Sequence, residues 1–168
     1  DENIWDLYGT RTRVQMQKAC PFELSTFEGY CLLTSSFFSA YMTNTEHRLL
    51  QAERDKTEDN TIILHDFFYK NYDLKIKYDP SDPLKPFVEF DDQIIGSTAE
   101  AFGTIYGNGK LMCDQPVAYD SYYNVCQKFV ILYTTIYVVG KGTVGTYVNI
   151  LEWISDEEAE QYKKEEGL

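Results

Sequence analysis

The stretch that decides the fold spans residues 106–153 and reads YGNGKLMCDQPVAYDSYYNVCQKFVILYTTIYVVGKGTVGTYVNILEW. Two strand-and-turn pairs lie side by side within it, because Gly107–Gly109 and Gly140–Gly142 are tight-turn sequences between strand-forming runs. Each pair carries a cysteine or a tryptophan at a defined place. This layout predicts the closing strands of a small antiparallel barrel, and a closed barrel of that size is expected to hold a bound molecule.

The rest of the chain continues the pattern, since Tyr, Phe, Val, Ile and Thr dominate from Ile62 onward. Alternation is cleanest in Asp73–Tyr78, where apolar residues face one way and charged residues the other. The range Arg48–Arg54 is also compatible with a helix, because most of its residues are good helix formers. We expect strands at Arg13–Ala19, Tyr30–Met42, Arg48–Arg54, Thr61–Tyr69, Asp73–Tyr78, Phe87–Phe90, Thr98–Tyr106, Leu111–Tyr119, Val125–Val139 and Thr143–Ile154.

Helices are expected only near the ends of the chain. Residues Asn3–Tyr8 would make one helical turn. Ser155 and Glu158 form a capping box that opens a helix over Asp156–Glu165. Sequential strands with short turns favour an up-and-down barrel over a Greek-key sandwich. We therefore predict an all-β fold, an eight-stranded antiparallel barrel with a short N-terminal helix and a C-terminal helix, in a single domain over residues 1–168.

Charge and composition exclude several classes of partner. The formal net charge is −12, from 27 acidic and 15 basic residues. Nucleic acid and anionic membranes need a basic face, so neither is an expected partner. No apolar run reaches the length of about 18 residues that a membrane span needs. The acidic excess is read as an aid to solubility, with a cationic ligand as the alternative. We expect a monomer.

The cysteines point to an oxidising compartment. Cys20, Cys31, Cys113 and Cys126 make an even count in a small, Tyr-rich chain, which favours two disulfides and secretion over reactive thiols. Three pairings remain open. The chain begins Asp-Glu-Asn, as a processed secreted protein would. Neither a CxxC pair, a histidine cluster nor a calcium-loop spacing occurs, so no metal or other cofactor is expected.

No motif indicates catalysis, and we do not expect an enzyme. His65 is better explained as a core or rim histidine than as a general base, because no triad element lies near it in sequence. Gly140–Gly145 is a hairpin turn rather than a phosphate loop, since it lacks the Walker spacing and no helix follows. The aromatic residues matter more. Several that occupy alternate strand positions should point into one lumen, as core or as pocket walls: Tyr106, Phe129, Tyr133, Tyr147 and Trp153.

Short motifs in a consistent order resemble the tick salivary lipocalins, the histamine-binding protein family. The segments that carry the resemblance are Trp5 with Leu7, Val14–Ala19, Gly29–Cys31, Gly109–Asp120 followed by Cys126, and Leu151–Trp153. They extend over nearly the whole chain, and together their order and spacing are more specific than any one of them. The resemblance implies a lipocalin-type barrel that is secreted in saliva and binds histamine, serotonin, leukotrienes, sterols or host proteins.

In the amine binders of that family, interior carboxylates pair with the ammonium and aromatic side chains flank the ring. The ligand-binding candidates transferred to this chain are Phe22, Glu23, Asp73, Tyr106, Asp114, Tyr133, Glu152 and Trp153. The chain also departs from the family, because Leu151, Gln115 and Gln127 stand where the family has pocket acids. Alternation turns Glu152 to the other face unless a bulge restores it.

The expected function is the sequestration of a host inflammatory mediator by a secreted lipocalin in immune evasion. A biogenic amine such as histamine or serotonin follows from the resemblance. The neutral residues at the acid positions favour instead lipid binding, with a fatty acid, eicosanoid or sterol as the ligand. A third interpretation is a protein-binding immunomodulator that uses the barrel only as a scaffold, with a host protein bound by its loops.

Overall fold

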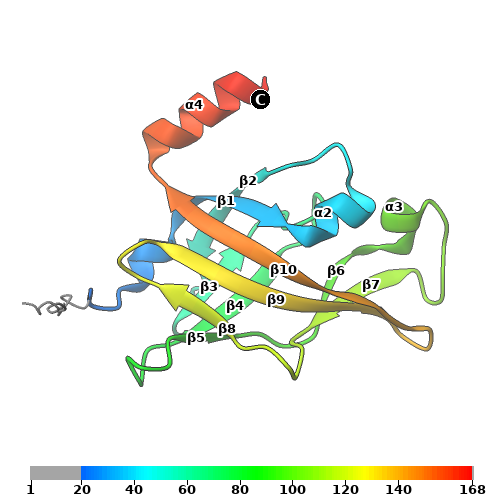
Figure 1. Ribbon diagram of the computed structural model, residues 1–168, viewed down its shortest axis with the longest axis horizontal. Coiled ribbons are helices and arrows are strands. Elements are labelled where there is room, and N and C mark those ends of the chain that lie inside the picture. Colours follow the sequence, from blue (N-terminus) through cyan, green and yellow to red (C-terminus); the bar gives the residue numbers. More distant parts are fainter. Residues whose placement is uncertain (1–19, 168) are drawn as a thin grey trace, which may run out of the picture.

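The computed structural model describes residues 20–167, and the predicted segments Asn3–Tyr8 and Arg13–Ala19 lie outside that range (Figure 1). The strands are β1 (Gly29–Ser35), β2 (Arg48–Arg54), β3 (Thr61–Leu64), β4 (Leu74–Asp79), β5 (Phe87–Glu89), β6 (Gln93–Ser97), β7 (Lys110–Asp114), β8 (Ser121–Asn124), β9 (Phe129–Val138) and β10 (Gly142–Ile154). The helical segments are the 3-10 turn η1 (Leu24–Phe27) and the helices α2 (Ser36–Tyr41), α3 (Thr98–Phe102) and α4 (Asp156–Glu166).

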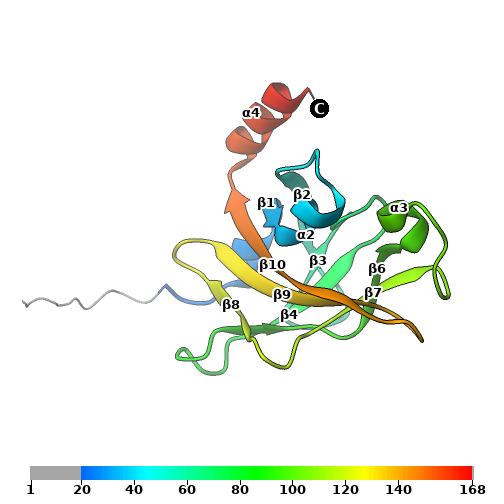
Figure 2. The same ribbon diagram turned by 45° about the vertical axis from the view of Figure 1, so that its right-hand side comes forward.

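Eight of these strands close into an antiparallel barrel, which confirms the mostly-β class and the eight-stranded barrel. Around the ring the order is β1, β2, β3, β4, β5, β8, β9 and β10, and β10 pairs back onto β1. The hairpin of β6 and β7 extends the sheet from the second half of β9. Figure 2 shows this hairpin at the same end of the barrel as α3.

The longest contact in the barrel is between β9 and β10. β9 contains ten residues, and they alternate without interruption between half-buried and buried side chains. Val130, Leu132 and Ile136 are among those that point inward, whereas Phe129 and Tyr133 point outward. Alternation of this kind is what a strand with one face on a core produces.

Aromatic side chains fill the barrel at the end covered by η1. Phe27 is buried between the strands, with its ring centroid 4.6 Å from that of Tyr78 and 5.1 Å from that of Trp153. Tyr123 and Phe22 complete this group. These rings pack together as part of the hydrophobic core at this end.

A second aromatic group fills the opposite end, under α2 and α3. Phe37 stacks on Phe68 at 4.4 Å and meets Tyr147 edge-to-face at 5.2 Å. Phe37 comes from α2, Phe68 from the turn after β3 and Tyr147 from β10. Segments far apart in sequence therefore meet here to close the barrel.

Between the two aromatic groups lies a buried polar network centred on Asn149. Its Oδ1 accepts a hydrogen bond from Ser35 Oγ at 2.6 Å. Its Nδ2 donates to the Leu132 carbonyl at 2.9 Å and to Thr134 Oγ1 at 3.0 Å. The network links β1, β9 and β10 across the seam that closes the barrel.

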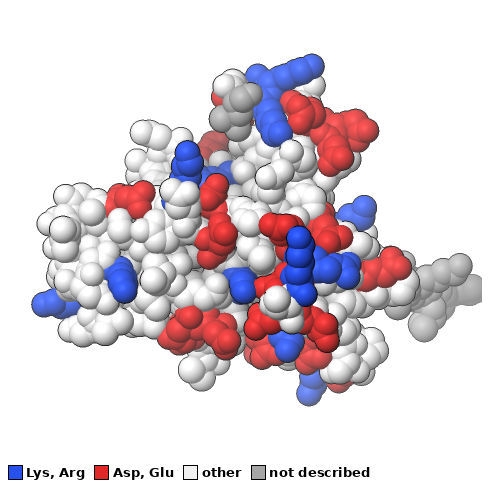
Figure 3. Space-filling view, turned by 180° about the vertical axis from the view of Figure 1, so that it is seen from behind, with Lys and Arg blue, Asp and Glu red and all other residues white. Residues whose placement is uncertain are grey.

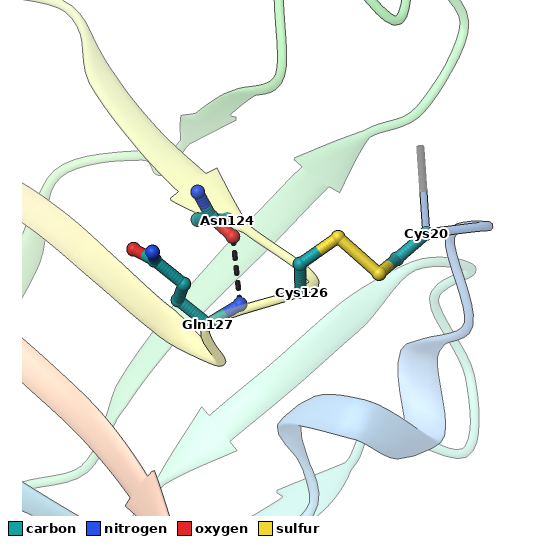
Figure 4. Close-up of a disulfide and its surroundings, with 4 residues drawn as sticks. All are labelled: Cys20, Asn124, Cys126 and Gln127. Carbon is teal, nitrogen blue, oxygen red and sulfur yellow. Dashed lines mark hydrogen bonds between the residues drawn. A yellow bond between two sulfur atoms is a disulfide. The ribbon is translucent and has the colours of Figure 1, made fainter. Parts of the chain in front are cut away.

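One of the two predicted disulfides is present. Cys20, just before η1, is bonded to Cys126 in the turn between β8 and β9 (Figure 4). In that turn, Asn124 Oδ1 accepts a hydrogen bond from the Gln127 backbone N–H. The bridge therefore ties the chain ahead of η1 to the opposite wall of the barrel.

The prediction of a second disulfide was wrong, because Cys31 and Cys113 are free thiols. Both are fully buried, on β1 and β7, which are not neighbours in the sheet. Burial raises the pKa of Cys113 to about 12 and also raises the pKa of Cys31, so each thiol stays protonated and unreactive.

Two predicted strands contain helices instead. The range Tyr30–Met42 turns helical at Ser36, because the Ser35 hydroxyl caps α2 by accepting from the Phe37 backbone N–H. The range Thr98–Tyr106 starts with α3, capped in the same way by Ser97. The apolar residues of both helices cover one end of the barrel, so their burial did not require a strand.

Other boundaries also moved. The expected strand Thr61–Tyr69 ends at Leu64, and Asp66 just after it adopts a positive φ angle of 51°. The expected strand Val125–Val139 begins with the disulfide turn, and both β6 and β8 were missed. The strand Arg48–Arg54 and the capping box that opens α4 are confirmed.

We expect the double substitution Cys20→Ser/Cys126→Ser to lower the free energy of unfolding by about 3–5 kcal/mol, because the bond closes a loop across a sequence separation of 106 residues. Urea unfolding of the variant measures this loss. Wild-type protein in a strong reductant should lose the same amount. An unchanged unfolding midpoint in both samples would contradict the assignment.

Substitution of Asn149 by Ala should cost about 2–4 kcal/mol, since it leaves the buried hydroxyls of Ser35 and Thr134 without their partner. Thr146→Ala is the matched control, because it removes a hydrogen bond to Thr135 on the exposed face of the same strands. Thermal and urea unfolding compare the two. Equal losses would show that Asn149 carries no special role in the seam.

Candidate functional site

The carboxylates expected in the pocket lie on the outside of the barrel. Glu152 is exposed between Leu151 and Trp153, which both point inward. The bulge that could have reversed it occurs elsewhere in β10, between Thr143 and Gly145. These positions place the Glu152 carboxylate in solvent.

Asp114 also faces outward, where it meets a second carboxylate. Partial burial raises the pKa of Asp114, and neighbouring Asp92 raises it further. Tyr137 donates a hydrogen bond to Asp92, which lowers the pKa of that carboxyl. The two acids therefore form a surface pair in which the pKa of Asp114 is raised and the pKa of Asp92 is lowered.

The remaining predicted acids are exposed as well. Glu23 stands at the start of η1, and its side chain makes no capping hydrogen bond. Asp73 is paired with His65 at 3.1 Å. None of the four acids chosen from the sequence offers its charge to the barrel interior.

The predicted aromatic residues divide among three places. Trp153 and Phe22 belong to the aromatic group at the η1 end. Trp153 lies in the interior, whereas Phe22 lies at the edge of the group. Tyr133 lies on the outer face of β9, stacked on Tyr119 at 5.0 Å. Tyr106 lies in the loop after α3, at the opposite end of the barrel. The sequence thus selected residues that do not form one site.

His65 is a surface residue held between two carboxylates. Its Nε2 lies 2.5 Å from Glu53 Oε1, and its Nδ1 lies 3.1 Å from Asp73 Oδ2. Partial desolvation acts to lower the pKa of His65, but the two carboxylates outweigh it and the pKa is raised. The ring therefore belongs to a surface ion-pair cluster with these two carboxylates.

An aromatic pocket of about 360 Å³ opens at the α2–α3 end of the barrel. This volume is typical of small-molecule sites, which hold a few polar groups in a mostly apolar lining. We call it the end pocket. Its described lining consists of Tyr41, Phe102, Thr104, Tyr106, Lys141, Gly142, Thr143 and Val144.

Three rings from three elements shape the end pocket. Tyr41 is the last residue of α2, Phe102 is the last residue of α3, and Tyr106 lies in the loop after α3. The centroid of Phe102 lies 5.3 Å from that of Tyr41 and 6.5 Å from that of Tyr106, with the rings close to edge-to-face in both pairs. Such spacing leaves ring faces available to a flat or apolar ligand.

A single charge stands over this aromatic wall. Lys141, in the turn between β9 and β10, places Nζ 5.5 Å from the Tyr106 ring centroid. It is the only charged residue among the described residues that line the end pocket. The charge on the lining of the end pocket therefore favours an anion.

Tyr147 lies beneath the end pocket. Its ring centroid is 6.5 Å from that of Tyr41. Burial raises the pKa of Tyr147 to about 12, and neighbouring Tyr41 adds to the shift. The hydroxyl thus remains a neutral hydrogen-bonding group at physiological pH.

A larger groove of about 570 Å³ crosses the barrel wall beside β4, but its chemistry is less specific. Its rim carries both lysines and carboxylates, among them Lys75, Lys77, Glu89 and Asp91. Figure 3 shows how charges of both signs gather over the face of the molecule opposite the view of Figure 1. Mixed, solvated charges select ligands poorly, so we assign the site to the smaller end pocket.

Sequence reasoning found one residue of the end pocket, Tyr106. It missed Tyr41 and Phe102 because both were placed in strands, and it treated Lys141 only as a turn residue. One signal could have placed Tyr41 and Phe102 in helices. It is the helix-capping serine that precedes each of the two segments, Ser35 and Ser97.

In residues 20–167 no group of three His, Cys, Asp or Glu side chains is arranged to hold a metal ion. None of the helices in the same range is long and apolar enough to cross a bilayer.

Comparison with known proteins gives one match. The sequence model of a family described as a domain of unknown function, DUF4984, matches residues 7–165. No curated protein and no solved structure matches the chain.

Because the pKa of His65 is raised on folding, the ion-pair cluster should add stability that is fully present below the unfolded pKa near 6.5 and is lost as pH rises through the folded pKa. The side chain is one-third exposed, so solvent screening limits the effect to less than about 1 kcal/mol. Unfolding of His65→Gln between pH 5.5 and 8.5 should lack this slope. His47→Gln is the control, because the His47 ring is hydrogen-bonded to the Thr34 hydroxyl. Identical slopes in His65→Gln and wild type would contradict it.

Proposed function

This chain belongs to the DUF4984 family, a domain of unknown function, and from its own structure we propose that it binds an apolar small molecule carrying an anionic group. Fatty acids and eicosanoids have that chemistry. The ligand would lie in the end pocket, with its apolar part against the rings of Tyr41, Phe102 and Tyr106 and its carboxylate near Lys141.

The observation that carries the proposal is the single positive charge over an aromatic wall. Burial of roughly 150–200 Å² of apolar ligand surface would contribute about 4–5 kcal/mol. A charge-assisted hydrogen bond from Lys141 to a carboxylate is stronger than a neutral one and fixes the orientation of the ligand. Together these terms amount to roughly 6–8 kcal/mol before the entropic cost of association, which corresponds to weak binding in the high-micromolar to millimolar range.

The same geometry gives less support to a biogenic amine. An ammonium group needs a carboxylate partner, and Glu23, Asp73, Asp114 and Glu152 all face solvent. The charge that does line the end pocket has the wrong sign for an amine. We therefore favour the lipid interpretation over histamine or serotonin.

We further propose that the protein acts outside the cell as a lipocalin that sequesters a host lipid mediator rather than as an enzyme. The Cys20–Cys126 bond supports this, since such bonds persist in oxidising compartments. The resemblance to salivary lipocalins supports the same role. The closed, filled barrel would then serve mainly to hold the end pocket in shape.

Calorimetric titration with oleate and arachidonate tests the proposal. Wild type should bind either one with a Kd below about 1 mM, and Lys141→Gln should bind it about 10-fold more weakly, because it loses the charge but keeps the shape of the pocket. Lys77→Gln, in the groove beside β4, is the matched control and should bind as wild type does.

Phe102→Ala should weaken binding of both fatty acids, because it removes one ring of the aromatic wall. The charge of Lys141 is unchanged in this variant. Far-ultraviolet circular dichroism would confirm that each variant is folded. Saturable histamine binding without any fatty-acid binding would refute the proposal. Equal affinity of wild type and Lys141→Gln would remove Lys141 from the site.

A further inference from the structure

Two turns border the end pocket, and they contact each other. Residues 103–109 connect α3 to β7, and residues 139–141 connect β9 to β10. The backbone of Gly107 approaches the β9–β10 hairpin so closely that a Cβ there would lie 2.7 Å from Val138 Cγ1 and 3.0 Å from Lys141 Cγ. Figure 1 shows both turns at the end of the molecule opposite η1. We call these two turns the rim.

The rim exposes three apolar side chains. Ile105 is 77 % exposed, Val139 is 55 % exposed and Tyr106 is 44 % exposed. Single exposed apolar residues are common on protein surfaces and need no explanation. Here three of them lie on two contacting turns, where polar residues and glycine are usual. They form an apolar patch that continues from the pocket lining, because Tyr106 belongs to both.

The charge at the rim is opposite in sign to that of the chain. Lys110 is the only charged residue in the segment 101–113, and Lys141 is the only one in the segment 129–151. Both lysines are exposed. The acidic residue closest to the first turn along the chain is Glu100, which lies on α3. The rim itself therefore carries positive charge and no acid.

Figure 3 shows the same contrast over one face of the molecule. The end that carries the rim is at the left of that view, and it is mostly white with blue groups at its edge. Red acidic groups are denser over the middle. A chain of net charge −12 thus presents one end that is poor in acids and bears lysines.

From the rim we propose that this end of the molecule docks on an anionic lipid surface. Ile105 and Val139 enter the boundary between headgroups and acyl chains, and Tyr106 lies at the headgroup level, where tyrosine is enriched. The ammonium groups of Lys110 and Lys141 are attracted to the negative charge of the lipid. The inference rests on the proposed function, because the lipid surface is the source from which the end pocket takes an apolar anion.

Electrostatics determines which end approaches the lipid. An anionic surface attracts the two lysines and repels the acidic remainder of the molecule. Salt screens charges that lie more than about 10 Å from that surface, so the docked end contributes most. Net charge, from which no membrane partner was expected, averages over the whole surface and does not describe this end. In the docked orientation the end pocket faces the lipid.

The small size of the rim favours lipid over a protein partner. Three exposed apolar side chains on two turns cover far less than the roughly 800 Å² per partner that a stable protein interface buries. A lipid surface adapts to each side chain that enters it, and each buried apolar side chain adds its own transfer free energy. The rim therefore fits a lipid surface without any further contact area.

Flotation with lipid vesicles tests this inference with the whole chain. Wild type should float with vesicles of phosphatidylcholine that contain about one-third phosphatidylserine. It should bind vesicles of phosphatidylcholine alone at least about 5-fold more weakly, because one lysine near an anionic surface contributes about 5-fold. Raising NaCl from about 0.05 M to about 0.5 M should remove most of this difference. Wild type that floats with neither kind of vesicle would overturn the proposal.

Ile105→Glu should weaken vesicle binding at least about 10-fold, because it places a carboxylate where an apolar side chain enters the lipid. Leu84→Glu is the matched control, since it makes the same change in charge at an exposed apolar residue in the loop between β4 and β5. That variant should bind vesicles as wild type does. Equal binding by Ile105→Glu and wild type, or an equal loss in Leu84→Glu, would also overturn it.

Two further measurements separate the alternatives. Oleate titration of Ile105→Glu without vesicles should match wild type, because Ile105 is not among the described residues that line the end pocket. This titration distinguishes a failure of docking from a failure of the end pocket. Sedimentation velocity tests for a second copy on the rim. Self-association of wild type that Ile105→Glu abolishes, without vesicle binding, would assign the rim to that copy and overturn the proposal.

Discussion

The pairing of β9 with β10 is the constraint on which the rest of this molecule depends. It joins ten residue pairs in one antiparallel ladder and brings the last strand within reach of β1, where the barrel closes. Because side chains alternate along both strands, the register decides which of them lie in the core and which face solvent. Asn149, bonded to Ser35 and Thr134, keeps the three closing strands in this alignment.

The register also determines where a ligand can lie. It sends Leu151 and Trp153 inward and Glu152 outward, so the interior becomes apolar and the acid becomes a surface group. Aromatic side chains from η1, α2 and the turn after β3 then fill the two ends of the barrel. What remains concave and aromatic is the end pocket, at the junction of α2, α3 and the β9–β10 turn.

Charge separates the end pocket from the rest of the molecule. Charges of both signs line the groove beside β4 and occur along α4, whereas the only charged residue among the described residues that line the end pocket is a lysine. A protein of net charge −12 repels an anionic ligand on average. The end pocket lies where that repulsion is locally absent.

The sequence alone determined the all-β class, the cleanest strands and the capped C-terminal helix, because these depend on alternation and local hydrogen bonds. Leu74, Ile76 and Tyr78 are buried as their period-two spacing predicts. Tertiary structure decided the rest. Segments such as Ser36–Tyr41 and Thr98–Phe102 can place their inward residues against a barrel end as helices, and only packing distinguishes this arrangement from a strand. The distance between cysteines depends on strand order, so Cys20 reaches Cys126 while Cys31 and Cys113 stay apart. The end pocket escaped detection for the same reason, since Tyr41, Phe102 and Lys141 come together only after the barrel has closed.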